Sequence, residues 1–159
     1  MRVVVISDSH RNTRVIDKIL SAQPEAKHVF FLGDNASDIE DFELLYPDKS
    51  FHAVCGNCDY FSALPTVGVE TVNGVRILYT HGHTFGVKGS TEHLLKTARD
   101  NNCQIALYGH THISKTVYED GVWLVNSGSC SSPREGRPSY AVIDITDKGI
   151  MPIIIEIKS

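Results

Sequence analysis

Five short segments of the chain carry side chains that bind divalent metal ions in proteins. They mix carboxylate and amide oxygens with imidazoles and require no thiolate, a combination that suits Mn, Fe, Co, Ni or Zn rather than Ca. The candidate ligands outnumber the positions around one tetrahedral ion, so they fit two metal ions that share a bridging carboxylate and a bridging water. These candidates are Asp8, His10, Asp34, Asn57, His81, His110 and His112.

Each of these residues alone has a simpler interpretation. A single Asp at the end of a strand is usually a turn or capping residue, and a Gly-Asn pair is usually a plain turn. A single histidine is more often a hydrogen-bonded, partly buried imidazole than a metal ligand. All of these interpretations would have to hold together, although five of the 8 histidines fall in these segments. A shared metal site is therefore the better prediction.

Each of the five segments directly follows a predicted β-strand. In open α/β sheets, the loops at the carboxyl ends of the strands line the ligand crevice. We therefore expect the five segments to converge on one place. The strands are predicted from apolar, often β-branched runs at residues 2–6, 29–32, 51–55, 75–79 and 105–108.

Helices are predicted between these strands. Asn12 or Thr13 caps a first helix, Ser37 and Glu40 form a capping box for a second, and Ser90 caps a third. Strands and helices that alternate from the first residue predict an α/β fold with a parallel sheet. After Pro65 the pattern changes to antiparallel hairpins, which are predicted at Asn73-Gly74, Asp120-Gly121 and Asp147-Lys148-Gly149.

Length and composition narrow the class of protein. A chain of 159 residues, 42% of them hydrophobic, predicts a single domain over residues 1–159. A net charge of -4 argues against a broad nucleic-acid-binding surface.

The chain has no apolar run of about 18 residues, which predicts no membrane partner. An apolar strand at its start, without a cleavage site, predicts a cytoplasmic protein. Its 4 cysteines are then expected to be reduced. Oligomeric state has no readable signal.

The order of the motifs resembles one known family. Asp-x-His, Gly-Asp, Gly-Asn, His-Gly-His and Gly-His-Thr-His follow one another between residues 8 and 112, and Asn126-Ser127-Gly128-Ser129 and Pro133-Arg134 come later. This order resembles the calcineurin-like metallophosphoesterases, and closely their small bacterial and archaeal phosphodiesterase branch. The resemblance implies an α/β, two-sheet β-sandwich flanked by helices, a four-layer α/β/β/α fold with a dinuclear metal site on its rim.

The resemblance also implies an activity and a set of ligands. The protein would hydrolyse small phosphate esters, most often phosphodiesters, by attack of a hydroxide that bridges two divalent metal ions. Mn²⁺ is the first choice of metal, with Ni²⁺, Co²⁺, Fe²⁺ or Zn²⁺ as alternatives. The metals concentrate the positive charge, which reconciles an acidic protein with an anionic substrate. By matching motif positions, Asp8, His10 and His112 would hold one metal ion, Asn57, His81 and His110 the other, and Asp34 both.

Some residues are expected to act on the substrate. Asp34 and Asn57 are assigned to catalysis as well as to metal binding, and Asn57 also to substrate binding. Many family members carry His immediately after the Gly-Asn motif, where it is thought to protonate the leaving oxygen, but this chain has Cys58. A thiol is a poorer acid for that task. His83 is a candidate substitute acid or phosphate contact, and Arg134 a candidate phosphate contact, although a solvated loop arginine is the more common case.

Two other classes of protein compete with an enzyme. Cys55-Gly56-Asn57-Cys58 is a C-x-x-C sequence, which is typical of thiol-disulfide exchange, but such a protein has no use for the histidines in the other segments. The family also includes a retromer scaffold subunit with the same fold and a degraded metal site. A non-catalytic interaction scaffold has no chemical need for the full set of ligand positions found here, so an enzyme is favoured.

Overall fold

Residues 3–6 form an uninterrupted apolar run because both faces of their strand are buried. In β1 (Arg2–Ile6), Val3 and Val5 belong to one hydrophobic core, whereas Val4 and Ile6 belong to another. This division follows from the two-residue period of a strand, which turns successive side chains to opposite faces. The first sheet is thus an interior layer of the molecule.

The first sheet combines parallel and antiparallel pairing. Its strand order is β10-β9-β1-β2-β3. The pairs β1–β2 and β2–β3 are parallel, as the alternation of strands and helices predicts, while β9 runs antiparallel to both β1 and β10. The other strands are β2 (His28–Phe31), β3 (Ser50–Ala53), β9 (Ser139–Thr146) and β10 (Gly149–Glu156).

The second sheet has the strand order β4-β5-β6-β8-β7. The predicted antiparallel hairpins are confirmed for β4–β5 and β7–β8. However, β5, β6 and β8 run parallel, so the change of pattern after Pro65 is not a complete change to antiparallel pairing. The strands are β4 (Val67–Val72), β5 (Val75–Thr80), β6 (Ile105–Tyr108), β7 (Lys115–Glu119) and β8 (Val122–Asn126).

The helices connect the parallel strands. Asn12 caps α1 (Thr13–Ala22) as predicted, since its side chain accepts a hydrogen bond from the Val15 amide at 3.3 Å. The prediction for Ser90 is one residue early, because Thr91 precedes α3, although the Ser90 hydroxyl accepts from the Glu92 amide at 3.1 Å. Within residues 1–158, no helix has the length and apolar character needed to cross a bilayer. The remaining helices are α2 (Glu40–Leu45), α3 (Glu92–Asp100) and the 3-10 helices η1 (Ala36–Ile39) and η2 (His83–Phe85).

The predicted capping box at Ser37 is wrong. Ser37 lies inside η1, and neither η1 nor α2 has a side-chain cap from the residue that precedes it. The physical reason lies elsewhere in the chain: the carboxylate of Asp59 accepts hydrogen bonds from the Asn35 amide at 2.8 Å and the Ala36 amide at 2.9 Å. A distant side chain thus satisfies the first N–H groups, which local reasoning assigned to Ser37.

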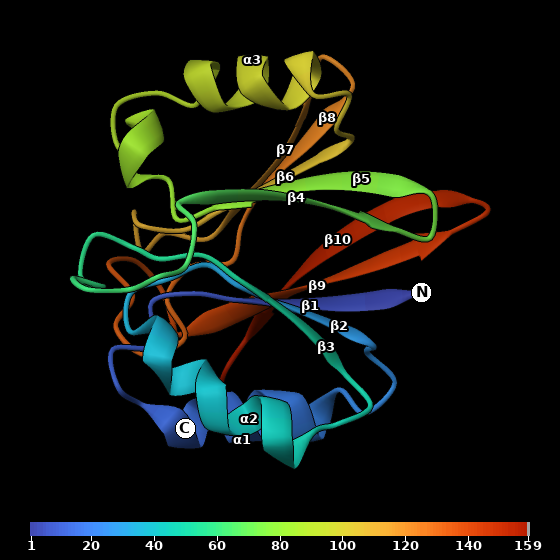
Figure 1. The fold of residues 1–159 in the computed structure, drawn as a ribbon. Helices are drawn as coiled ribbons and strands as arrows, with labels where there is room; N and C mark the ends of the chain where they lie inside the picture. The colour runs from blue at the N-terminus through green and yellow to red at the C-terminus, as the bar shows by residue number, and fades with distance from the viewer. Residues whose placement is uncertain (159) are drawn as a thin grey trace.

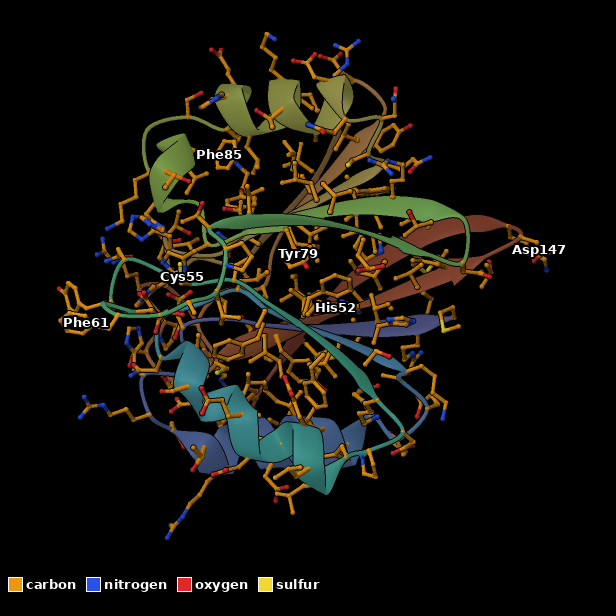
Figure 2. The ribbon with its side chains drawn as sticks, in the orientation of Figure 1. His52, Cys55, Phe61, Tyr79, Phe85 and Asp147 are labelled. Atoms are coloured by element: carbon orange, nitrogen blue, oxygen red, sulfur yellow. The ribbon has the colours of Figure 1, made fainter. Side chains whose placement is uncertain are left out.

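The computed structural model, which describes residues 1–158, has four layers (Figure 1). α1 and α2 cover the outer face of the first sheet, and α3 covers the outer face of the second. One hydrophobic core lies between the sheets, where His52 of the first sheet meets Tyr79 of the second with 6.2 Å between ring centroids (Figure 2). Two further cores lie beneath the helices. The predicted α/β/β/α architecture is confirmed.

Candidate metal centre

The five ligand-bearing segments meet at one end of the sandwich, where the loops after β1, β2, β3 and β5 gather on the left of Figure 1. Backbone hydrogen bonds tie these loops together. The Asp8 amide donates to the Gly33 carbonyl at 3.1 Å, and the Gly109 amide donates to the His81 carbonyl at 2.9 Å. The convergence that the strand-end positions predict is therefore present in the structure.

The first cluster of possible ligands contains Asp8, His10, Asp34 and His112. One ligand atom from each of these residues lies within 4.8 Å of the others. His112 Nε2 is 3.1 Å from Asp8 Oδ1 and 3.3 Å from His10 Nε2. The two carboxylates are buried, while both imidazoles are partly exposed. This arrangement leaves the cluster open to solvent on its histidine side.

The second cluster is centred on His81 Nε2. This atom lies 3.0 Å from Asn57 Oδ1, 3.2 Å from His110 Nδ1 and 3.5 Å from Asp34 Oδ2. Asp34 belongs to both clusters, as expected for a bridging ligand. All seven predicted ligands are thus brought together, six of them in two groups of three on either side of Asp34.

Backbone carbonyls orient two of the histidines. His81 Nδ1 lies 2.7 Å from the Leu32 carbonyl, and His112 Nδ1 lies 2.9 Å from the Ser132 carbonyl. A carbonyl only accepts, so each Nδ1 donates to it and each ring turns Nε2 into its cluster. There the Nε2 atoms face carboxylate and amide oxygens. Nitrogen and oxygen atoms that converge in this way fit a cation.

Asp8 supports this interpretation independently. Its Oδ1 is buried and has no hydrogen-bond partner. Its Oδ2 accepts from the Ser7 hydroxyl at 2.6 Å and from the His110 amide at 3.2 Å. Burial opposes ionisation of this carboxyl, but the interaction with His112 and the charge of His81 hold its pKa below the usual value. The carboxylate is therefore held charged with one oxygen left for a ligand.

The glycines of the motifs make room for ligands on other loops. A Cβ on Gly56 would collide with the Asp34 carboxylate and with His81 Nδ1, and a Cβ on Gly109 would collide with Ser7 and the Asp8 carboxylate. Each motif therefore contributes both a ligand and the space that a ligand of another loop occupies. This explains why Gly precedes Asn57 and His110.

Five of the possible ligands have left-handed backbone angles. The φ values are 55° for Asp8, 46° for His10, 58° for Asp34, 68° for His110 and 59° for His112. Non-glycine residues rarely adopt this conformation, and such strain gathers at functional sites. The loops turn sharply here to direct these side chains into the clusters.

Asp59 organises the site but was not predicted to have a role. Besides its bonds to Asn35 and Ala36, its carboxylate accepts hydrogen bonds from the Asp34 amide at 2.9 Å and the Gly56 amide at 2.7 Å. It fixes the loop after β2 to the loop after β3. Its only sequence signal is its place two residues after Asn57, which gives no indication of partners 23–25 residues away.

The residues expected to act on substrate lie around the clusters. The Cys58 amide donates to Asp34 Oδ1 at 3.0 Å, and burial and the charge of Asp34 raise the pKa of its thiol. His83 lies 5.5 Å from His81 and 6.2 Å from His110 between ring centroids, and its buried Nδ1 has no hydrogen-bond partner. Arg134 is exposed, and its amide donates to the His112 carbonyl at 3.0 Å.

Burial keeps several imidazoles neutral. It lowers the pKa of His110 to about 4, with a further contribution from His81, and it also lowers the pKa of His83. His112 differs, because its interaction with the Asp8 carboxylate, 3.1 Å from Nε2, raises its pKa. A neutral imidazole offers the lone pair that metal coordination requires. Near neutral pH, His110 is therefore ready to coordinate, whereas a proton on His112 would compete with a metal ion.

The sequence matches a known family over most of its length. The family model of the calcineurin-like phosphoesterase superfamily domain covers residues 1–148. The probable metallophosphoesterase YsnB of Bacillus subtilis is 29% identical over 148 residues, which span 91% of this chain and 85% of that protein. Phosphodiesterase YfcE of Escherichia coli is 31% identical over 101 residues, which span 58% of this chain and 51% of that protein.

Two further comparisons concern the fold and a second kind of relative. A crystal structure of a predicted phosphoesterase from Streptococcus pneumoniae superposes with a TM-score of 0.84 at 26% identity, over 98% of this chain and 88% of that one. Vacuolar protein sorting-associated protein 29 of Schizosaccharomyces pombe is 29% identical over 160 residues, which span 98% of this chain and 83% of that protein.

Proposed function

The chain belongs to the calcineurin-like phosphoesterase superfamily, and from that premise we propose that it is a phosphodiesterase that uses two divalent metal ions. The observation that carries the proposal is the convergence of possible ligand atoms from five loops, with the Asp34 carboxylate shared by the two groups. A relative named as a phosphodiesterase supports diester substrates. Small phosphate esters are the proposed substrate class.

The two clusters divide the metal ligands. Asp8, His10 and His112 would hold one ion, Asn57, His81 and His110 the other, and Asp34 both. Two such cations supply charge stabilisation of phosphoryl oxygens and an acidified water as nucleophile. Their oxygen and imidazole ligands suit Mn²⁺ first, with Ni²⁺, Co²⁺, Fe²⁺ and Zn²⁺ as alternatives.

The surrounding side chains would orient the substrate and supply a proton to its leaving oxygen. The neutral imidazole of His83 has a free buried Nδ1 beside the second cluster, which suits a hydrogen bond to a phosphoryl oxygen. The Arg134 amide donates to the His112 carbonyl, which holds this residue near the first cluster, and its guanidinium is the proposed contact for an anion bound there. Cys58 stays a neutral thiol and is the proposed donor of a proton to the leaving oxygen.

Hydrolysis of bis(p-nitrophenyl) phosphate with added Mn²⁺ tests the proposal. We expect turnover by the natural protein and its loss in Asp34→Ala and Asn57→Ala. Asp41→Ala, at an exposed position of α2, serves as the control and should keep full activity. Circular dichroism shows whether each variant is folded. Absence of turnover with all five metals would contradict the proposal.

A non-catalytic interaction scaffold is the second candidate. The likeness to a vacuolar protein sorting-associated protein favours it. The complete ligand set favours the enzyme, because a scaffold does not need buried carboxylates or left-handed backbone angles at ligand positions. The hydrolysis assay separates the two, since a scaffold would give no turnover with any metal.

A further inference from the structure

We propose that a cleft beside the metal centre binds the alcohol portion of the ester, and that this portion is an aromatic group without negative charge. The inference rests on the proposed function and specifies its substrate. The cleft has a volume of about 550 Å³, within the range of pockets that hold small ligands. Its lining includes Ile39, Cys58, Tyr60, Phe61 and Leu64.

The cleft is lined by residues that directly follow two ligands of the second cluster. Cys58, which lines it, follows the possible ligand Asn57, and the Cys58 amide donates to Asp34 Oδ1 at 3.0 Å. Asn35 and Ala36, which also line it, follow Asp34 directly. A phosphoryl group held between the clusters would therefore have one ester substituent at the mouth of the cleft.

Two aromatic side chains are presented to solvent at this mouth. Tyr60 is 76% exposed and Phe61 is 108% exposed. Figure 2 shows Phe61 projecting outward from the end of its loop. Phe61 also has a φ of 58°, which is a rare conformation for a bulky residue. Neither its exposure nor its backbone angle helps the fold, so both are consistent with a ligand-binding role.

The charges of the cleft select against a second phosphate. Glu40, Glu43 and Asp59 line it, and its lining contains no Lys or Arg. The carboxylate of Asp59 is already engaged by backbone amides, which leaves Glu40 and Glu43 as the negative charges facing an occupant. An anionic substituent would be repelled, whereas an uncharged ring can stack on Tyr60 or Phe61.

The position of Cys58 places one ester substituent in the cleft. Cys58 lines the cleft and follows the possible ligand Asn57 directly. The alcohol portion on this side of the phosphoryl group therefore lies against Tyr60 and Phe61. These two are positioning residues for that alcohol portion, and they do not take part in the chemical step.

Binding of phenylphosphonate and methylphosphonate to the Mn²⁺-loaded protein, measured by isothermal titration calorimetry, tests this inference without turnover. Both carry the same phosphoryl group, and only one has a ring. We expect phenylphosphonate to bind about tenfold more tightly, as is typical of aromatic stacking. Phe61→Ala should remove most of that ratio without changing methylphosphonate binding, and Phe61→Trp should restore it.

Leu44→Ala is the matched control. Leu44 is 83% exposed on α2 and is not part of the cleft, so its loss should leave the ratio unchanged. Equal affinities for the two phosphonates, or a ratio unaffected by Phe61→Ala, would overturn the inference and leave the proposed function standing. Failure of both phosphonates and of inorganic phosphate to bind would overturn the phosphoryl site and the inference together.

Discussion

At the scale of one residue, the backbone conformation of His10 is expected to destabilise the fold. Its φ of 46° places a side chain with a Cβ in the left-handed region. In the metal-free protein, we expect His10→Gly to have a free energy of unfolding about 1 kcal/mol higher than His10→Ala. Urea unfolding measures the difference. Lys18, exposed in α1, is the control: there the Ala variant should be more stable than the Gly variant. If the Ala variant were the more stable one at His10 as well, the result would argue against strain at His10.

Cys58 sets a second prediction at this scale. Burial and the charge of Asp34 raise the pKa of its thiol, so it is a poor proton donor near neutral pH. Alkyl esters depend on protonation of the leaving oxygen, which contributes on the order of 100-fold or more to their rate of hydrolysis. Phenolic esters do not need this proton and should therefore react much faster. Cys58→His should narrow the gap. Rates that do not vary with the pKa of the leaving alcohol would refute this role of Cys58.

At the scale of loops and strands, Gly56 and Gly109 have to accommodate carboxylates from other loops. Gly56→Ala or Gly109→Ala should displace Asp34 or Asp8 and weaken Mn²⁺ binding by about 10-fold or more, as do other changes that reposition metal ligands. Calorimetric titration with Mn²⁺ measures the affinity. Gly89→Ala is the control, because its Cβ would meet only the Gly86 carbonyl at 3.7 Å. Unchanged affinity in both site variants would contradict the packing argument.

The neighbouring strands β2 and β3 carry a pH-sensitive pair. His28 Nδ1 lies 3.0 Å from His52 Nε2, and burial lowers the pKa of both residues below the ordinary 6.5. The unfolded chain then binds more protons than the folded chain. The stability that the neutral pair contributes is therefore complete above the ordinary pKa of 6.5. It is lost as the pH falls from that value towards the lower pKa values of the folded protein.

Urea unfolding of the metal-free protein at about pH 7.5 and about pH 5.5 tests this linkage. The natural chain should lose stability between the two conditions, and His52→Gln should lose less. His93→Gln, at an exposed position of α3, should behave like the natural chain. If His52→Gln lost as much stability as the natural chain, the pair would not be the source of the dependence.

Local patterns predicted most of the elements because their causes are local. The hairpins at Asn73-Gly74 and Asp120-Gly121 follow from residues that accept a positive φ, and the run from Val3 to Ile6 follows from burial on both faces. The capping box at Ser37 failed because Asp59, from the loop after β3, accepts hydrogen bonds from the amides at the start of η1. Contacts between distant loops leave no periodic pattern in the sequence.

At the scale of the whole molecule, neither sheet carries a complete site. Asp8, Asp34 and Asn57 follow strands of the first sheet, whereas His81 and His110 follow strands of the second. The sequence predicted that these residues converge, because parallel strands end at a common edge. It did not predict that Asp59 joins two of the loops or that Phe61 is presented beside them, since both depend on how the loops fold over the edge.

Crystallography of the Mn²⁺-loaded protein with anomalous scattering tests the central claim most directly. We predict two anomalous peaks, one bounded by Asp8, His10 and His112 and one by Asn57, His81 and His110, with Asp34 contacting both. Diffraction data from an Asp34→Ala crystal should lack at least one peak. The absence of both peaks from the natural protein, or peaks located away from these side chains, would contradict a dinuclear centre at the edge of the two sheets.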